Sequence, residues 1–138
     1  VADPGALVVN AARKKGIEIV PLSGLSSIMM ALMASGMNGQ QFRFHGYLPI
    51  DNKQKASRLK DMVSFASRGE TQIFIETPYR NDKLLLDLIK LIPGSLRISV
   101  AIDISLPSEE IHSKTVAEWK SGNLPKMHKR PAVFLIGV

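Results

Sequence analysis

The chain contains no cysteine in its 138 residues, which excludes a disulfide framework and a thiolate metal site. Its three histidines have no second ligand type at the spacing of a metal site, so no metal is expected. No apolar run reaches the ~18 residues that a membrane helix needs, and no secretory signal is visible. These absences predict a cytoplasmic protein that has no membrane partner.

Aromatic residues and nucleotide-binding motifs are also scarce. Two tyrosines and one tryptophan do not suffice for the stacking platform of single-strand binders. Neither Gly-x-Gly-x-x-Gly nor a P-loop occurs. Positive charge is abundant, since 18 Lys and Arg stand against 12 Asp and Glu, for a net charge of +6. Such a balance favours anionic partners, RNA among them.

Much of the positive charge lies on a helix expected over residues 51–67, which carries Lys53, Lys55 and Arg58. These side chains point to several sides of the helix, so two interpretations stay open. They belong to an ordinary solvated face, or they contact the phosphate backbone of a nucleic acid. The second interpretation makes them candidate substrate-binding residues.

Helix and strand patterns alternate from end to end. Asp3 and Pro4 have the residue types of an N-cap and a first helical position. Helices are predicted near residues 3–15, 26–36, 51–67, 82–92 and 115–120. Strands are predicted near residues 17–22, 42–48, 72–75, 96–104, 110–113 and 132–138. The alternation predicts an α/β fold with a mixed, mostly parallel sheet, and it is compatible with an antiparallel strand near the end.

A domain boundary is predicted at residues 37–41, where Gly36, Asn38 and Gly39 interrupt the pattern. The sequence begins with Val1 and not with an initiator methionine. We therefore expect a piece of a longer protein.

The most informative segment is Ile73–Arg80, which reads Ile-Phe-Ile-Glu-Thr-Pro-Tyr-Arg. Pro78 biases Thr77 toward an extended conformation, so an apolar strand should end here. Glu76 and Arg80 are thus candidate catalytic residues at the carboxyl end of a buried strand, where open α/β sheets bind ligands. The alternative is that the two residues simply pair and hold the turn.

A second candidate is the turn Pro21–Ser27, which joins a strand to the start of a helix. Its free amide groups and the hydroxyls of Ser26 and Ser27 can hold a carboxylate or the edge of a ribose. The alternative is ordinary helix capping by one of the two serines.

Four segments in this order resemble the tetrapyrrole (corrin/porphyrin) methylase superfamily of S-adenosylmethionine-dependent methyltransferases. They are Ala2-Asp3-Pro4-Gly5, Val20–Ser27 with Ala34-Ser35-Gly36, Phe44-His45-Gly46-Tyr47-Leu48-Pro49 and Ile73–Arg80. Within the superfamily, the chain most resembles the branch that includes the small-subunit ribosomal RNA ribose-2′-O-methyltransferase. The match covers nearly the whole chain.

The resemblance implies the carboxyl-terminal fragment of a two-domain enzyme. Each domain is then a three-layer helix–sheet–helix sandwich, and the donor, S-adenosylmethionine, binds between the two. Residues 1–36 correspond to the tail of a truncated donor-binding domain, and residues 37–138 to the carboxyl-terminal domain. The residues that the resemblance places at the donor are Gly24, Ser26, Ser27, Ile75 and Glu76.

The sequence departs from the ribosomal RNA branch at three places. The branch has Pro-Gly-Pro where this chain has Ser23-Gly24-Leu25. It has an Arg-Glu pair and a lysine where this chain has Ile102-Asp103 and Leu106. It has Lys-Gly-Glu where this chain has Lys129-Arg130-Pro131. Buried polar groups in a binding site distinguish one substrate from another. The changes in polar residues at these places therefore affect which methyl acceptor is expected. An RNA ribose hydroxyl is the first expected acceptor, and a tetrapyrrole carbon is the second. A non-catalytic RNA-binding module of the same fold is the alternative.

The expected truncation has two consequences. Half of the donor site is missing, so the fragment alone is predicted to be inactive. Apolar faces also lose their cover, and exposed apolar patches promote association. The residues on these faces are Leu7, Val8, Ile19, Met29 and Met33. A homodimer, or poor order before residue 37, is therefore expected.

Overall fold

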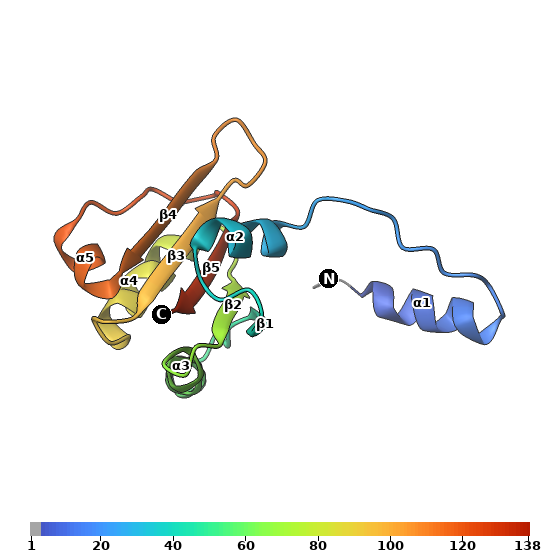
Figure 1. The fold of residues 1–138 in the computed structure, drawn as a ribbon, viewed down its shortest axis with the longest axis horizontal. Coiled ribbons are helices and arrows are strands. Elements are labelled where there is room, and N and C mark those ends of the chain that lie inside the picture. The colour runs from blue at the N-terminus through green and yellow to red at the C-terminus, as the bar shows by residue number, and fades with distance from the viewer. Residues whose placement is uncertain (1–3) are drawn as a thin grey trace.

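Five strands form one mixed sheet in the computed structural model, which describes residues 4–138 (Figure 1). The strands are β1 (Phe42–Tyr47), β2 (Thr71–Ile75), β3 (Arg97–Ile102), β4 (Glu110–Thr115) and β5 (Ala132–Gly137). Their order across the sheet is β1-β2-β5-β3-β4. The helices are α1 (Gly5–Lys14), α2 (Ser27–Ser35), α3 (Asn52–Ala66), α4 (Asn81–Leu91) and α5 (Val116–Ser121).

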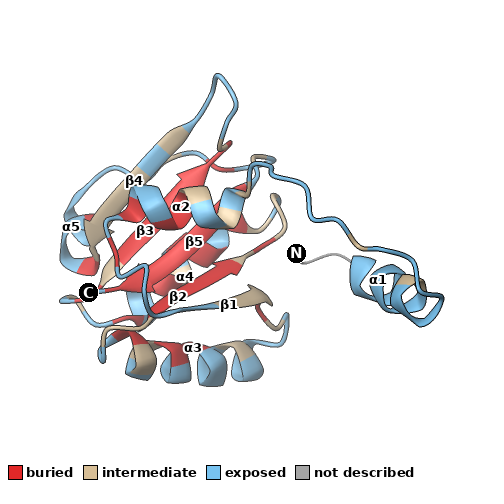
Figure 2. Cartoon of the chain, turned by 45° about the vertical axis from the view of Figure 1, so that its right-hand side comes forward, coloured by how far each residue is buried: buried red, intermediate tan, exposed pale blue. Residues whose placement is uncertain are grey.

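Helices cover both faces of this sheet, as Figures 1 and 2 show. On one face, Ala31 and Leu32 of α2 pack with Leu135 of β5 in one apolar cluster. On the other face, α3, α4 and α5 share a larger cluster that includes Phe74 and Trp119. The predicted α/β fold with helix–sheet–helix layers is therefore confirmed.

The direction of the strands differs from the prediction. Within residues 4–138, the pair β1–β2 is parallel, whereas β2–β5, β3–β5 and β3–β4 are antiparallel. The expectation of a mostly parallel sheet is therefore wrong, although the sheet is mixed. Strand β5 is buried on both faces, and such an apolar run carries no sign of its direction. The connection over residues 103–109 is also too short for the crossover that parallel pairing needs.

A strand predicted over residues 17–22 is absent from the described chain. These residues run as an extended segment between α1 and α2, away from the sheet (Figure 1). A β-strand needs a hydrogen-bonded neighbour, and no strand lies beside this segment within residues 4–138. The apolar pattern alone therefore does not make it a strand.

The helix ends follow the capping chemistry of the sequence. The hydroxyl of Ser26 accepts a hydrogen bond from the Met29 amide at 3.5 Å, and Gly36, with φ of +74°, ends α2. Asp51 caps α3 by accepting from the Gln54 amide at 2.9 Å. The predicted cap at Asp3 lies outside the described residues.

Helix α2 lies before the predicted domain boundary at residues 37–41, yet it packs on the sheet that follows this boundary. It therefore forms one layer of the same structural unit. The assignment of residues 1–36 to a separate, truncated domain stays a prediction.

The buried face of α4 allows a matched test of the core. Leu88→Ala should lower the free energy of unfolding by about 2–5 kcal/mol, because Leu88 is fully buried and truncation leaves a cavity. Leu86→Ala on the same helix should cost no more than about 1 kcal/mol, since Leu86 is 44% exposed. Urea denaturation measures both variants. Equal losses would contradict the orientation of α4.

Association of the chain stays a prediction that the structure motivates. Leu7 and Val8 on α1 are exposed, as are Met29 and Met33 on α2, whereas Ile19 is half-buried. We expect residues 1–138 on their own to associate, and Met33→Lys to weaken the association. Light scattering across a concentration series measures it. A monomer at every concentration would show the expectation to be wrong.

Candidate active-site cleft

A cleft of about 310 Å³ opens where β1, β2 and β3 end and β5 begins. Its apolar wall includes Ile75, Ala101 and Val133 from three adjacent strands. Its polar side chains include Glu76 after β2 and Asp103 after β3. The carboxyl ends of parallel strands are the usual ligand-binding edge of an α/β sheet, so this cleft is the candidate active site.

The cleft brings together three of the predicted donor residues, namely Ser27, Ile75 and Glu76. Ser26 is the cap of α2, and its hydroxyl faces the helix start. Gly24 does not line the cleft in the described structure. The role of all five residues at a donor stays a prediction.

Glu76 is held in place by two short hydrogen bonds. The Thr77 amide and Nη2 of Arg80 each donate to Oε1 of Glu76 at 2.7 Å. The pairing predicted as the simpler alternative is therefore present. Both bonds use the same oxygen, so Oε2 accepts no hydrogen bond from the described residues. A fixed carboxylate with one free oxygen can accept a bond from a ligand hydroxyl or amine.

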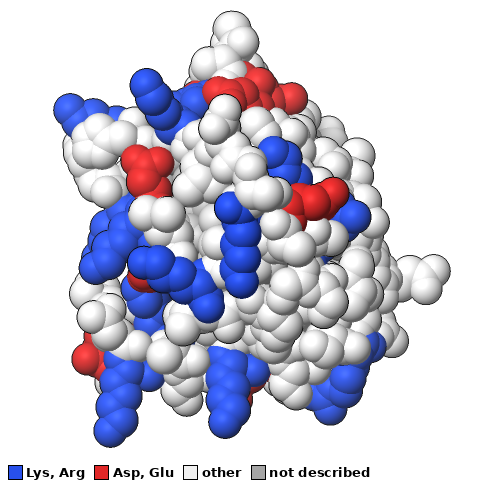
Figure 3. Space-filling view, turned by 90° about the vertical axis from the view of Figure 1, so that its left-hand side faces the viewer, with Lys and Arg blue, Asp and Glu red and all other residues white. Residues whose placement is uncertain are grey.

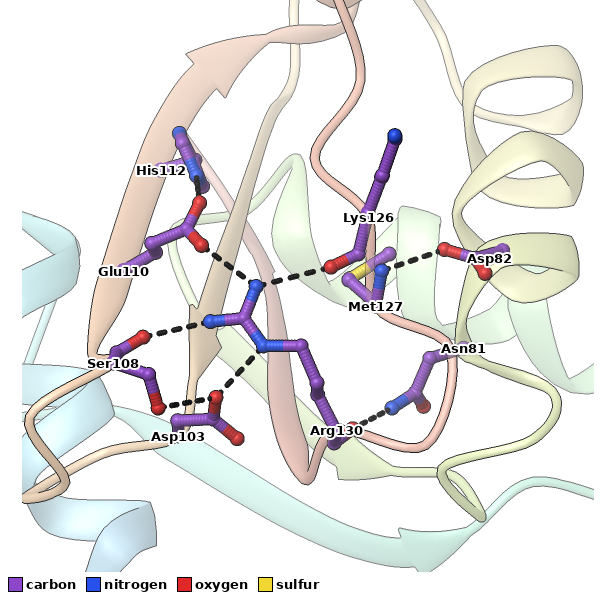
Figure 4. Close-up of polar contacts among 9 residues, drawn as sticks. All are labelled: Asn81, Asp82, Asp103, Ser108, Glu110, His112, Lys126, Met127 and Arg130. Atoms are coloured by element: carbon purple, nitrogen blue, oxygen red, sulfur yellow. Dashed lines mark hydrogen bonds and ion pairs between the residues drawn. The ribbon is translucent and has the colours of Figure 1, made fainter.

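The opposite wall of the cleft carries a polar cluster that the sequence analysis did not find (Figure 4). Nε of Arg130 donates to Oδ2 of Asp103 at 2.7 Å, and Nη1 donates to Oε1 of Glu110 at 2.6 Å. Nη2 donates to the Ser108 carbonyl at 2.7 Å. Arg130 thus holds the β3–β4 loop against the segment that precedes β5.

The signal for this cluster lay in the departures from the ribosomal RNA branch. Asp103 and Arg130 stand in two of the three departing segments, and they pair with each other. Arg130 is a base that stands where the branch has glycine, and such a new cation is a candidate partner for a carboxylate such as Asp103. Because Asp103 and Arg130 are 27 residues apart in the sequence, no local sequence pattern predicts that they pair.

The cluster shifts the acid–base equilibria of its members. The hydrogen bond from Arg130 is the main reason why the pKa of Asp103 is lowered, and the Ser108 hydroxyl adds to it. Arg130 likewise lowers the pKa of Glu110, with help from His112. The two carboxylates in turn raise the pKa of Arg130.

The backbone around the cluster is strained. Asp103 and Ser105 have φ of 50° and 68°, and Lys129 has φ of 63°, in the region that favours glycine. Residues held in this region persist when their surroundings fix them, and they gather at functional sites. The bonds of Arg130 supply such fixation here.

The basic residues predicted on α3 do not share one hollow. Nζ of Lys55 pairs with Asp87 of α4 at 3.0 Å and lines a small hollow near Glu76. Arg58 lines a different hollow beside Tyr47, and Lys53 is exposed. On the side of the molecule seen in Figure 3, cationic side chains are spread over the surface and do not form one stripe.

His45 lies apart from the residues of the cleft. Its Nε2 is 2.7 Å from Oε1 of Gln72, and partial burial lowers the pKa of its imidazole. Within residues 4–138, no group of three or more acidic or histidine side chains could hold a metal ion. In the same residues, no helix is long and apolar enough to cross a membrane.

The chain has relatives among known proteins. No protein-family model matches the chain. The chain is 33% identical over 137 residues to ribosomal RNA small subunit methyltransferase I of Xylella fastidiosa, covering 99% of this chain and 49% of that protein. The protein of the same name from Vibrio cholerae is 31% identical over 86% of this chain and 40% of its own length. The protein of the same name from Bacillus subtilis is 34% identical over 86% of this chain and 39% of its own length.

Solved structures share the fold at lower identity. The methyltransferase CobJ has a TM-score of 0.56 and 21% identity, covering 96% of this chain and 57% of its own. An Entamoeba histolytica protein described as a diphthine synthase has a TM-score of 0.61 and 14% identity, covering 98% and 60%.

The homologues of this chain are members of the tetrapyrrole methylase superfamily, and the chain shares the fold of the methyltransferase CobJ. These homologues are the proteins named ribosomal RNA small subunit methyltransferase I. The chain spans half or less of the length of these curated relatives.

The Arg130 cluster predicts a specific dependence of stability on pH. Because Asp103 and Glu110 have lowered pKa values, their stabilisation is complete above the ordinary carboxyl pKa of about 4 and is lost as the pH falls below it. Arg130→Met should lower the urea midpoint at neutral pH. The difference from the unchanged protein should stay constant above about pH 5 and shrink as the pH falls from about 4 toward 2.

Lys129→Met is the matched control, because it removes a neighbouring cation that takes part in no ion pair of the described structure. It should leave the pH dependence unchanged. A constant gap between Arg130→Met and the unchanged protein across the pH range would contradict the lowered pKa values.

Proposed function

We propose that the protein to which this chain belongs is an S-adenosylmethionine-dependent methyltransferase that modifies small-subunit ribosomal RNA at a ribose 2′-hydroxyl. The observation that carries the proposal is the homology to ribosomal RNA small subunit methyltransferase I over 99% of the chain. The cleft supports it, because it gathers Ser27, Ile75 and Glu76 at the ligand-binding edge of the sheet. The net charge of +6 suits an RNA substrate.

The residues of the cleft fit the proposed donor. The apolar wall of Ile75, Ala101 and Val133 suits the faces of an adenosine. Glu76 and Asp103 place carboxylates in the lining, and carboxylates are complementary to the positive charge of a sulfonium. When bound, S-adenosylmethionine supplies an electrophilic methyl group.

The chain's own residues contribute alignment and exclusion of water, which such a transfer needs more than it needs a strong acid. In our proposal, Oε2 of Glu76 accepts a hydrogen bond from a ligand hydroxyl and fixes its direction. Arg80 acts as a positioning residue, because its guanidinium holds the other carboxylate oxygen at 2.7 Å. Ser27, at the start of α2, also lines the cleft and carries a hydroxyl.

The departures from the ribosomal RNA branch favour a second candidate, a non-catalytic RNA-binding module. An Arg-Glu pair of that branch is replaced by Ile102-Asp103, and Asp103 is engaged by Arg130 and the Ser108 hydroxyl. Oδ2 of Asp103 accepts both of these hydrogen bonds, so one of the two carboxylate oxygens is occupied by structural contacts. A tetrapyrrole acceptor has weaker support, because the likeness to CobJ is one of fold.

Calorimetry of donor binding by the whole protein separates the enzyme from the binding module. The enzyme binds S-adenosylmethionine and transfers its methyl group to isolated small ribosomal subunits. No detectable affinity for the donor eliminates the enzyme. Residues 1–138 alone are expected to transfer no methyl group, and robust activity from them would contradict the shared donor site.

Glu76→Gln tests the residue that the proposal places at the ligand. Loss of a charged hydrogen bond is worth about 1.5–3 kcal/mol, so kcat/KM should fall roughly 10- to 100-fold in the whole protein. Glu70→Gln is the control, because Glu70 pairs with Arg43 outside the cleft. Equal activity of the two variants, at unchanged urea midpoints, would remove Glu76 from the mechanism.

A further inference from the structure

We propose that a small hollow beside the cleft is a binding site for one backbone phosphate of the RNA. The hollow has a volume of about 110 Å³ and shares Glu76 with the cleft. Lys55 of α3 lines it together with Arg80 and Lys83 at the start of α4. This inference rests on the proposed function, since it takes the polymer to be RNA.

The size of the hollow selects a small group. Pockets for nucleoside-sized ligands have volumes of about 300–1,000 Å³, so a base does not fit. One water occupies about 30 Å³ of liquid, so the hollow has room for several atoms of a ligand. A phosphate group lies between these limits.

The charges around the hollow leave one cation uncompensated. Arg80 pairs with Glu76 at 2.7 Å, and Lys55 pairs with Asp87 at 3.0 Å. Lys83 is exposed and takes part in no ion pair of the described structure. Three cations against two carboxylates leave a charge of +1, which one phosphodiester of charge −1 balances.

The donors of Arg80 are only partly used. Its Nη2 bonds to Glu76, whereas Nη1 donates to no described residue, and the side chain is 39% exposed. A guanidinium with open N–H groups matches the oxygens of a phosphate.

The start of α4 adds to this potential. No side chain caps its first turn, where Arg80 and Lys83 line the hollow. The partial positive charge of a helix amino terminus favours an anion.

The shared residue sets the place of the phosphate along the RNA. Because Glu76 lines both spaces, a phosphate in the hollow lies next to a nucleotide whose hydroxyl enters the cleft. The site therefore positions the backbone and leaves the bases unread, as phosphate contacts do.

Lys83→Ala in the whole protein tests the site, because Lys83 is exposed and its loss breaks no described ion pair. The probe is a short single-stranded RNA of mixed sequence, titrated by fluorescence anisotropy at several salt concentrations. Binding should weaken roughly three- to tenfold. The slope of log K against log salt should flatten by about 0.7–1, and Lys83→Arg should restore it.

Lys90→Ala is the matched control, because it removes the same charge from an exposed position of the same helix, away from the hollow. It should leave the slope unchanged. Equal effects of Lys83→Ala and Lys90→Ala would overturn the site and indicate diffuse attraction.

Donor binding separates the remaining outcomes. If Lys83→Ala weakens binding of S-adenosylmethionine and leaves the RNA slope unchanged, the hollow serves the donor's carboxylate and the phosphate site is wrong. If the unchanged protein methylates RNA but Lys83→Ala has no effect on RNA binding, the phosphate site is wrong and the proposed function stands. If the unchanged protein does not bind the RNA probe, the phosphate site is wrong, whereas the proposed function is decided by donor binding and by methyl transfer to small ribosomal subunits.

Discussion

The insertion of β5 between β2 and β3 is the constraint on which the rest of the structure depends. The strand is buried on both faces and pairs antiparallel with both neighbours. Its register places Val133 opposite Ile75 and Ala101, so its first residues meet the ends of the other two strands. The ring of Phe134 stacks on Phe74 at 5.7 Å and fixes the contact. The floor of the cleft is therefore made by three adjacent strands, β2, β5 and β3, in one register.

Each wall of the cleft repeats one device, a carboxylate fixed by an arginine. Glu76 is held by Arg80 on one wall, and Asp103 is held by Arg130 on the other. Arg130 lies two residues before β5, and the Asp103 amide bonds to the Pro131 carbonyl at 2.9 Å. The strand that makes the floor thus also anchors one wall. Groups held in this way need little rearrangement when a ligand binds, which is the physical meaning of preorganisation.

Local chemistry made much of this fold predictable. Helix ends followed from Ser26, Asp51 and Gly36, because capping depends on neighbouring residues. The placement of Glu76 and Arg80 just after the end of a buried strand followed from one apolar run and one proline. Strand direction and the pair of Asp103 with Arg130 did not follow, since both depend on contacts between distant segments. The prediction of a strand over residues 17–22 was wrong for the same reason. Their apolar pattern fits a strand, but the pattern does not show whether a neighbouring strand is present to pair with.

The sharing of Glu76 by the cleft and the small hollow has a thermodynamic consequence. Arg80 contacts Glu76 and also lines the hollow, so an anion bound there competes with Glu76 for the same guanidinium. In the proposed complex, such competition weakens the bond from Arg80 to Oε1 of Glu76 and makes the carboxylate a better acceptor, while the Thr77 amide still holds it in place. Coupling of this kind is reciprocal, so a ligand that draws Glu76 into the cleft strengthens phosphate binding in the hollow. In the proposed RNA complex, the two spaces therefore act as one site, in which the backbone contact prepares the carboxylate that would meet the reacting nucleotide.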